Sequence, residues 1–412
     1  MRFLFVHQNF PGQFLHLVRH LVDQRIHDVI FITEENGNLI PGVRKAIYRM
    51  PAPQPDTHRD AQEFEAGMIR AGLVAGVAAN LRTLGFQPDI IIGHQGWGEM
   101  LNLQDVFPGV PLLGYFEFFY NLRGYDVNFD PEFPSLVESL SRIRAKNAIN
   151  LLALTNPGHG QTPTRFQHGS YPAWAQPGIT VLPEGVNLDT CRPDPAVRAA
   201  PFTLPGFEVL PGEKLVTYVA RDLEPYRGFH VLMRALPAVL RERPDVKVVL
   251  VGADGVSYGA RVLNSTYREW LMGEVGPALD PSRVHFPGRL DYETYVRMLQ
   301  RSDAHVYLTY PFVASWSLRE ALACGCAIVA SDTAPVLEFV RHGETGLLTP
   351  FLDPAALTAA ILGILADDAR TAWLRAGARA YAVANLRMRD HIVAYHALIN
   401  RMTGNQLGAA FS

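Results

Sequence analysis

The chain has 412 residues, a length that favours two domains over a single hydrophobic core. Its 48% hydrophobic and 19% charged residues are ordinary for a globular enzyme, and a net charge of −3 gives no basic surface for nucleic acid. No run of about 18 apolar residues occurs, so no membrane span is predicted. The cysteines, Cys191, Cys324 and Cys326, are too few for a disulfide framework and lack zinc-ligand spacing, which fits a reducing cytoplasm.

The first half of the chain alternates short apolar strands with longer helical stretches. Continuous apolar strands separated by helices are typical of a parallel sheet covered on both faces. We therefore expect a doubly wound α/β domain over residues 1–190. The expected strands are 2–7, 28–33, 89–94, 111–119, 150–155 and a last one in 178–186, and the expected helices are 11–24 and 63–84.

A proline-rich stretch at 187–214 interrupts this pattern and is interpreted as the interdomain linker. The alternation then restarts, which predicts a second doubly wound domain over residues 191–389. A last helix, at about 390–412, is expected to pack back on the first domain. Two such domains place the carboxyl-end loops of their strands across a shared cleft, where open α/β sheets bind ligands. The expected strands are 214–220, 246–253, 283–288, 304–310, 327–331 and 345–349, and the expected helices are 228–243, 264–275, 291–302, 317–325 and 334–343.

The loop between the strand at 304–310 and the helix at 317–325 has the features of an anion site. The free N–H groups and the dipole of a helix amino terminus favour negative charge, and Ser315 and Ser317 add hydroxyl donors. Glu320 follows Ser317 by three residues, which is also the spacing of a capping box. Helix capping alone is therefore the alternative interpretation.

Two arginines bracket the turn after the first strand of the second domain. Guanidinium groups suit bidentate contacts with phosphate, so Arg221 and Arg227 are candidate phosphate ligands. Gly228 then permits a close approach of the backbone before the helix. The alternative is that both arginines are solvated surface charges.

Two further turns follow strand ends. In "VHQNFPGQF", Gly12 allows the chain to approach a ligand, although no G-x-G-x-x-G fingerprint of dinucleotide binding is present. In "VHFPGRLDY", the residues Phe286 to Arg289 can lie against a base. In both places an ordinary turn is the alternative.

His94 and Glu117 are the candidate reactive groups of the first domain. His94 ends a strand and is followed by a glycine-containing loop, although a lone histidine is more often structural. Glu117 lies in an aromatic setting, where an unpaired carboxylate is costly to bury. Glu117 therefore has either a structural partner or a perturbed pKa in a cleft.

Taken together, these motifs resemble the retaining glycosyltransferases of the GT-B fold, glycosyltransferase family 4. The resemblance is strongest from Leu215 to Leu348 and extends to "HQNFPGQF" and "TVLPEGVNLDTCRPD". It implies transfer of a sugar from a nucleotide-diphosphate sugar, with a UDP-sugar favoured, to an acceptor hydroxyl in glycan or glycoconjugate synthesis. It also implies two facing Rossmann-like domains, no metal ion and no other cofactor. The acceptor is left open as a saccharide, a lipid-linked molecule or a small molecule.

The resemblance also implies roles for individual residues. Arg221 and Arg227 would grip the donor diphosphate and act in catalysis, with Gly12 near the diphosphate. Glu320 would bind the nucleotide ribose. The remaining donor-binding residues are Ala314, Ser315, Trp316 and Ser317 at the sugar and phosphates, and Phe286, Gly288 and Arg289 at the base.

The sequence departs from the family pattern at three places. The two arginines are one residue further apart than in the family, Phe312 replaces the first glutamate of an E-x7-E motif, and Glu117 replaces a frequent histidine. Glu117 is expected to orient an acceptor hydroxyl or to stabilise positive charge on the sugar ring, and His94 is a further candidate catalytic residue. Because of Phe312, the identity of the donor sugar is left open.

Two other functions are compatible with these residues. One is a nucleotide-sugar epimerase of GT-B-like fold, which needs no acceptor. The other is a non-catalytic protein that binds a nucleotide-sugar, an interpretation that Phe312 leaves open.

Overall fold

The structure, a computed structural model, describes residues 1–53, 56–404 and 407. It divides the chain into two compact units. Unit 1 comprises Met1–Glu184 and Met388–Ser412, and unit 2 comprises Gly185–Arg387. The division predicted from the sequence placed residues 185–190 with the first domain. Of the last helix predicted at about 390–412, α15 (Met388–Thr403) is observed, and residues 405–406 and 408–412 lie outside the described part.

Within the described residues, unit 1 contains one sheet of seven strands, all parallel, in the order β3-β2-β1-β4-β5-β6-β7. The strands are β1 (Arg2–Val6), β2 (Asp28–Glu34), β3 (Val43–Tyr48), β4 (Ile90–His94), β5 (Leu112–Tyr115), β6 (His159–Thr162) and β7 (Ile179–Val181). The helices of this unit are η1 (Gly12–Phe14), α1 (Leu15–Asp23), α2 (Gln62–Thr83), α3 (Leu103–Val106), η2 (Val137–Ser139), α4 (Leu140–Lys146), α5 (Ala148–Thr155), α6 (Arg165–Ser170), η3 (Gln176–Gly178) and α15.

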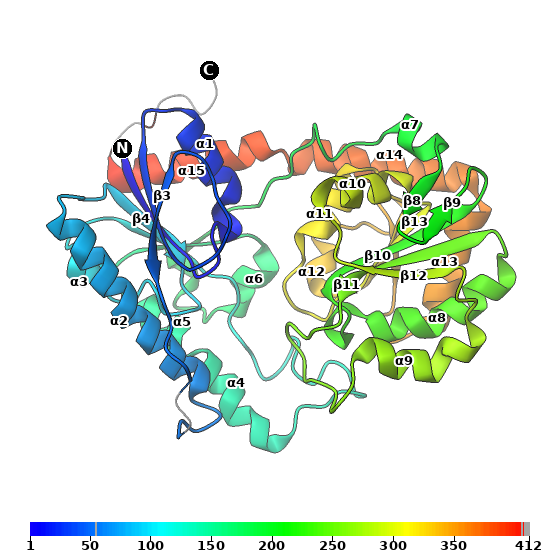
Figure 1. Ribbon diagram of the computed structural model, residues 1–412, viewed down its shortest axis with the longest axis horizontal. Helices are drawn as coiled ribbons and strands as arrows, with labels where there is room; N and C mark the ends of the chain where they lie inside the picture. Colours follow the sequence, from blue (N-terminus) through cyan, green and yellow to red (C-terminus); the bar gives the residue numbers. More distant parts are fainter. Residues whose placement is uncertain (54–55, 405–406, 408–412) are drawn as a thin grey trace. The chain divides into compact units, whose positions relative to one another are not determined.

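Side chains that alternate along β1 serve two different cores. Phe3 and Phe5 pack with residues of α1 and α15, which lie side by side in Figure 1. Leu4 and Val6 pack with residues of α2 on the other face. The sheet is therefore covered on both sides, as continuous apolar strands require.

Within the described residues, unit 2 contains a sheet of six parallel strands in the order β12-β11-β10-β13-β14-β15 and a small antiparallel hairpin, β8 with β9. The strands are β8 (Phe202–Leu204), β9 (Phe207–Val209), β10 (Lys214–Asp222), β11 (Val246–Ala253), β12 (Val284–Gly288), β13 (Ala304–Tyr307), β14 (Ile328–Ser331) and β15 (Leu347–Thr349). The helices are α7 (Pro195–Ala199), η4 (Pro225–Arg227), α8 (Phe229–Glu242), α9 (Tyr267–Val275), η5 (Gly276–Ala278), α10 (Tyr292–Arg301), α11 (Trp316–Ala323), α12 (Ala334–Leu337), α13 (Pro354–Ala366) and α14 (Asp368–Asn385).

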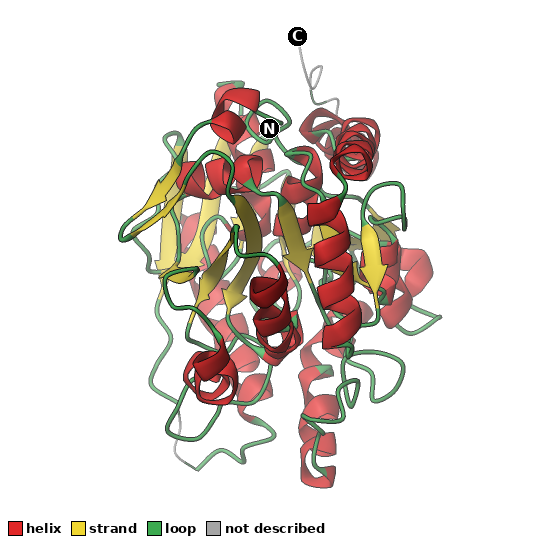
Figure 2. Cartoon of the chain, turned by 90° about the vertical axis from the view of Figure 1, so that its right-hand side faces the viewer, coloured by secondary structure: helices red, strands yellow, loops and turns green. Residues whose placement is uncertain are grey.

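The six-stranded sheet also lies between two layers of helices, as Figures 1 and 2 show. The core on one face joins strand residues such as Val249 and Ile328 to side chains of α10, α11 and α14. On the other face, α8 packs against α13 and β11. Unit 2 is thus a second doubly wound α/β layer structure.

Both sheets reverse their strand order at one point. In unit 1 the reversal lies between β1 and β4, and in unit 2 it lies between β10 and β13. In open α/β sheets, ligands bind in the crevice outside the carboxyl ends of the strands at such a switch point. The loops after these four strands therefore define where a site is to be looked for.

Part of the predicted secondary structure is wrong. Residues 150–155, predicted as a strand, belong to helix α5, where Ile149 and Ala153 are buried and Leu151 and Leu152 are partly exposed. Burial four residues apart is a helical pattern that a short apolar run conceals. The strand at this place is the polar β6, and β3 was not predicted.

The predicted strand at 111–119 stops at Tyr115, so Glu117 lies in the loop beyond the strand end.

Among the described helices, none combines the length and the apolar character needed to cross a membrane.

Candidate functional site

The two loops at the switch point of unit 2 are bound to each other. The backbone N–H of Tyr310, after β13, donates to the carbonyl of Tyr226, after β10, at 3.0 Å. Gly228, the N-cap residue of α8, has φ +69°, and a Cβ there would lie 2.4 Å from Cβ of Leu308. Glycine is therefore required both for the left-handed backbone and for the close packing of the two loops.

Arg227 lies inside this pair of loops with only 7% of its surface exposed. Its Nη1 donates to Thr309 Oγ1 and to the carbonyl of Val313, each at 2.8 Å, and its Cζ lies 5.1 Å from the ring centre of Tyr258. No carboxylate that the structure describes forms an ion pair with it. Burial works against the charge, but the neighbouring Tyr307, Tyr258 and Glu224 raise the pKa of Arg227, so the guanidinium is charged and, without a direct ion pair, can attract an anion.

Arg221 lies near the end of β10, and its surroundings differ from those of Arg227. Its side chain is exposed, and it makes no hydrogen bond or ion pair with any described residue. The pairing of β10 with β11 shifts register between Val219 and Asp222, a bulge that turns the end of the strand. The structure thus puts both predicted arginines at the carboxyl edge, one buried and one in solvent.

Helix α11 begins at Trp316, with Ser315 as its N-cap residue. The N–H of Ser315 donates to the Tyr307 hydroxyl at 2.8 Å, and the hydroxyls of Ser315 and Ser317 lie 2.6 Å apart. Ala314 is buried, whereas Trp316 is exposed. The predicted loop therefore runs from the end of β13 directly into a helix amino terminus.

Glu320 does not cap this helix, so the capping-box alternative is wrong. Ser315, not Ser317, is the N-cap residue, and no side-chain capping bond forms there. The two oxygens of Glu320 instead accept hydrogen bonds from two phenols, Oε1 from Tyr292 at 2.9 Å and Oε2 from Tyr295 at 2.8 Å. Burial raises the pKa of this carboxyl, and the two phenol bonds oppose that rise.

The residues predicted to meet the base lie at the end of β12. Arg289 has an exposed side chain, and its Nη2 lies 3.9 Å from Asp222 Oδ1 at the end of β10. Phe286 is half-buried, 5.6 Å from the guanidinium of Arg268. Gly288 is the last residue of the strand. An ion pair thus connects this loop to the strand that carries Arg221.

Sequence reasoning missed two carboxylates between the arginines, Asp222 and Glu224. Glu224 is completely buried and accepts backbone N–H bonds from Ser257 at 3.2 Å, Tyr258 at 3.1 Å and Gly259 at 3.0 Å. Burial raises the pKa of Glu224, and these three bonds oppose the rise. The carboxylate therefore fixes the loop that carries the Tyr258 ring beneath Arg227.

Asp222 accepts a hydrogen bond from the Ser257 hydroxyl and so holds the same loop. A sequence signal for both residues exists, because two acids stand between two arginines at the end of an apolar strand. The signal was overlooked because the arginines alone matched the expected chemistry.

Phe312, which stands where the family has a glutamate, is buried in an aromatic cluster. Its ring centre lies 4.9 Å from that of Tyr258 and 5.8 Å from that of Tyr226. The ring of Tyr226 lies in turn 4.5 Å from that of Tyr310. An apolar contact therefore replaces a charged group at this position.

In unit 1, the structure brings His94 and Glu117 together. The N–H of Gly96 donates to His94 Nδ1 at 2.9 Å, so the neutral ring carries its proton on Nε2. This Nε2 lies 3.5 Å from Glu117 Oε2, and 35% of the Glu117 side chain is exposed. A buried imidazole N–H thus faces a carboxylate that solvent can reach.

His7, at the end of β1, is a residue that sequence reasoning missed. Its Nδ1 accepts the N–H of Asn9 at 2.8 Å, and its ring lies 5.3 Å from that of His94. Burial, with a smaller effect of His94, lowers the pKa of His7 to about 3, so the ring is neutral.

Gly12 lies directly against this ring. It has φ +55°, and a Cβ there would lie 2.9 Å from His7 Cδ2. A histidine at the end of an apolar strand was the available signal for His7.

Two family models match the chain. One is described as "Glycosyl transferase family 4 group" and matches residues 25–191, and the other is described as "Glycosyl transferases group 1" and matches residues 205–381.

Curated relatives match over part of the chain. A phosphatidyl-myo-inositol mannosyltransferase of Mycobacterium leprae is 31% identical over 204 residues, which are 48% of this chain and 48% of that protein. A GDP-mannose-dependent alpha-(1-6)-phosphatidylinositol monomannoside mannosyltransferase of Mycolicibacterium smegmatis is 28% identical over 235 residues, 55% of this chain and 57% of that protein. The matches therefore span about half the length of these relatives.

Solved structures match over nearly the whole chain. A sucrose-phosphate synthase from Thermosynechococcus elongatus aligns with a TM-score of 0.74 and 20% identity, over 98% of this chain and 99% of that one. At this identity the match concerns the fold.

Proposed function

Because the chain belongs to the GT-B glycosyltransferases of family 4, we propose that it transfers a sugar from a nucleotide-diphosphate sugar to an acceptor hydroxyl, with retention of the anomeric configuration. The observation that carries this proposal is the buried charge of Arg227 at the switch point of unit 2, which forms no direct ion pair with a described carboxylate.

The donor diphosphate is the anion that this edge receives. Arg227 supplies a buried charge, Arg221 an exposed one, and the amino terminus of α11 supplies N–H groups and hydroxyls. Such groups stabilise the negative charge that grows on the leaving diphosphate as the glycosidic bond breaks. In this proposal the protein itself supplies that stabilisation, without a metal ion.

The nucleoside part of the donor uses the neighbouring groups. Glu320 accepts hydrogen bonds from the ribose hydroxyls, as it does from two phenols in the structure. Phe286, Gly288 and Arg289 meet the base. Ala314, Ser315, Trp316 and Ser317 contact the sugar and phosphates through the loop before α11.

The acceptor hydroxyl is oriented by Glu117 of unit 1. His94 Nε2 lies 3.5 Å from an oxygen of this carboxylate. An ionised carboxylate can accept a hydrogen bond from the acceptor hydroxyl and stabilise positive charge on the sugar ring. Gly12 and His7 shape the adjacent loop.

Two donors have separate support. The sequence resemblance favours a UDP-sugar, whereas a relative that matches 55% of this chain is named for its dependence on GDP-mannose. The names of two relatives support a phosphatidylinositol-based acceptor, in addition to the saccharide, lipid-linked and small-molecule acceptors left open by the sequence. The donor and the acceptor therefore have to be tested in combination.

The test is a panel of UDP- and GDP-sugars incubated with the purified protein, with and without saccharide and phosphatidylinositol acceptors. Release of nucleoside diphosphate from one donor, with a glycosylated product of unchanged anomeric configuration, is expected. No release with any pair, together with no nucleotide binding, would contradict the proposal.

A second candidate is a nucleotide-sugar binding protein without turnover, which the burial of Phe312 in an aromatic cluster favours. Tight nucleotide binding without release on any acceptor would identify it. An epimerase of the same fold would instead change the configuration of the sugar in the absence of an acceptor.

A further inference from the structure

The two phenols that hold Glu320 differ in their surroundings. Tyr295 is buried, with 9% of its surface exposed, whereas Tyr292 is 52% exposed. The Tyr292 hydrogen bond to Oε1 therefore lies at the surface, and the Tyr295 bond to Oε2 lies inside. The carboxylate has one inner oxygen that is fixed by the core and one outer oxygen that solvent approaches.

Two hydroxyls donating to the two oxygens of one carboxylate is also the arrangement that a vicinal diol makes. The Tyr292 hydroxyl, 2.9 Å from Oε1, thus occupies a position at the carboxylate that one hydroxyl of a ribose diol can take. A carboxylate can accept further bonds, but they weaken as donors crowd the same oxygen. A ligand diol approaching from solvent meets Tyr292 first.

The position of Tyr292 allows its hydroxyl to move away from Glu320. It is the first residue of α10, after the N-cap residue Asp291, and its ring is outside the core. Its hydroxyl also contacts Cys191 Sγ at 3.3 Å, so the phenol retains a partner when Glu320 is taken. Tyr295, in contrast, contributes its ring to the core beneath α10.

We propose that Tyr292 is a placeholder for a ribose hydroxyl of the nucleotide, displaced from Glu320 when the donor binds, while Tyr295 stays and orients the carboxylate. This inference rests on the proposed function, because it takes the diol to be the ribose of a nucleoside diphosphate. Tyr292 then sets the donor affinity, since the apparent affinity falls with the fraction of molecules in which the outer oxygen is free.

The experiment is calorimetry of UDP and GDP with the wild-type protein and with Tyr292→Phe, which keeps the ring and removes the competing hydroxyl. Tyr292→Phe is expected to bind the favoured nucleotide about fivefold more tightly, if roughly one molecule in five has a free outer oxygen. The 2′,3′-dideoxy form of the same nucleotide has no diol, and its affinity is expected to be unchanged by the substitution.

Tyr295→Phe is the matched control. It removes the same atom from the inner oxygen, where no ligand competes, so it is expected to weaken nucleotide binding. Thermal unfolding of both variants checks that the two phenylalanines leave the fold intact.

Equal or weaker ribonucleotide binding by Tyr292→Phe would overturn the placeholder role while leaving the proposed function standing. A gain of the same size for the dideoxy nucleotide would overturn it as well, because the effect would not involve the diol. Absence of nucleotide binding in every form would overturn both the inference and the proposed function.

Discussion

The sheet of unit 2 has a buried arginine at each end of its strands, and the two are neutralised differently. Arg301, at the amino edge, donates to Asp303 Oδ2 at 2.7 Å and to the carbonyl of Glu213 at 2.8 Å. Arg227, at the carboxyl edge, is also buried, but its direct contacts are a hydroxyl, a carbonyl and an aromatic ring, and the carboxylate of Glu224 acts on it without a direct ion pair. Arg301 has a direct carboxylate partner, whereas Arg227 forms no direct ion pair with a described residue.

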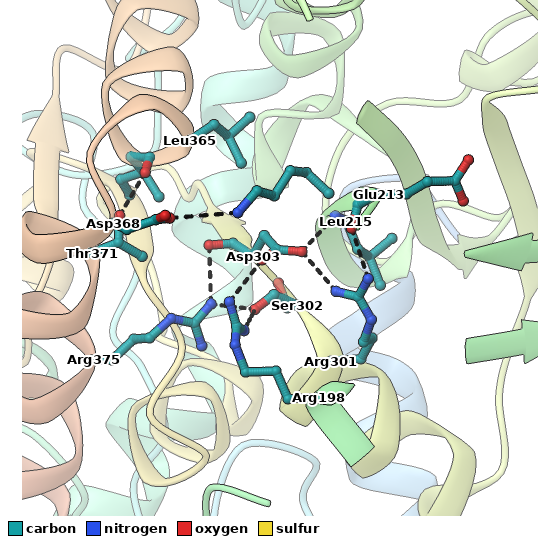
Figure 3. A network of polar contacts seen from close by, with 12 residues as sticks. Arg198, Glu213, Leu215, Arg301, Ser302, Asp303, Leu365, Asp368, Thr371 and Arg375 are labelled. Carbon is teal, nitrogen blue, oxygen red and sulfur yellow. Dashed lines mark hydrogen bonds and ion pairs between the residues drawn. The ribbon is translucent and has the colours of Figure 1, made fainter. Parts of the chain in front are cut away.

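Figure 3 shows a network of hydrogen bonds and ion pairs around Asp303 at the amino edge of the sheet. Asp303 Oδ1 accepts from Arg198 at 2.7 Å, and Oδ2 accepts from the backbone N–H of Leu215 at 2.8 Å in addition to Arg301. Arg375 donates to the carbonyl of Ser302 at 2.5 Å. Burial, followed by the charge of Arg198, lowers the pKa of Arg375 to about 10.

Arg301 and Arg227 thus represent two kinds of buried charge, one within a network of ion pairs and one without a direct ion pair. Removing one member of a satisfied buried network leaves its partners uncompensated and destabilises the fold. Removing a buried charge that has no direct ion pair is expected to affect ligand binding more than folding. The predictions that follow test this separation, from the largest expected effect to the smallest.

The largest effect is expected for Asp303→Asn. The substitution leaves several guanidinium groups facing a neutral amide, so the free energy of unfolding is expected to fall by about 3–5 kcal/mol. Urea denaturation measures this change. Asp368→Asn is the control, because Asp368 pairs with Lys214 at 3.5 Å from a highly exposed position. Equal free energies of unfolding for the two variants would show that the network around Asp303 does not stabilise the fold.

Arg227→Met is expected to have the opposite profile. Loss of the buried charge should lower turnover of the nucleotide-sugar about 100- to 1,000-fold, in the range found for a lost transition-state donor. The free energy of unfolding is expected to fall less than in Arg301→Met, because no direct ion pair is broken, although two hydrogen bonds and the charge near the buried Glu224 are lost.

Release of nucleoside diphosphate and urea denaturation on the same preparation measure both quantities. Arg301→Met is the matched control and is expected to lose stability. If Arg227→Met loses as much stability as Arg301→Met, the two edges do not differ as described.

Arg221→Ala is expected to affect function alone and less strongly. One charge-assisted contact to phosphate corresponds to a roughly 10- to 100-fold loss of turnover. The free energy of unfolding is expected to change by less than about 0.5 kcal/mol, as at other exposed positions. Unchanged turnover would remove Arg221 from the site.

The smallest expected effect is a pH dependence of the free energy of unfolding, caused by His305 near the amino edge of the sheet. His305 is fully buried, its Nδ1 lies 2.9 Å from Thr217 Oγ1, and burial lowers its pKa from 6.5 to about 4. The unfolded chain therefore binds more protons than the folded one between these values, so stability falls as the pH drops from 6.5 towards 4. Below about 4 both states are protonated and the loss is complete.

His305→Gln should flatten this dependence, which denaturation midpoints at pH 7 and pH 5 can measure. The difference between wild type and variant is expected to be on the order of 1–2 kcal/mol over this interval. Parallel midpoint curves would show that His305 contributes nothing to acid sensitivity.

The sequence predicted the carboxyl edge of unit 2 better than the amino edge for a physical reason. Arg227 and Ser315 each follow an apolar strand, and the ends of parallel strands converge, so local sequence indicates a shared site. Arg198 lies on α7, Asp303 directly before β13, and Arg375 on α14, far apart in the chain. Nothing in their local spacing indicates that they meet.

Other differences have similar origins. The strand predicted at 150–155 is a helix because a short apolar run fits either period. The partners of Glu320 were missed because Tyr292 and Tyr295 lie on another helix, more than twenty residues earlier in the chain. The roles of Glu224 and His7 depend on backbone N–H groups, whose directions follow only from the folded loops.

The central claim is that Arg227 is a charge kept for the diphosphate of the donor. The most direct measurement is calorimetry of UDP against uridine, and of GDP against guanosine, with wild type and Arg227→Met. The account predicts that the diphosphate of the favoured nucleotide increases affinity in the wild type and that Arg227→Met loses most of this increase. An increase of the same size in Arg227→Met would show that the diphosphate is bound elsewhere.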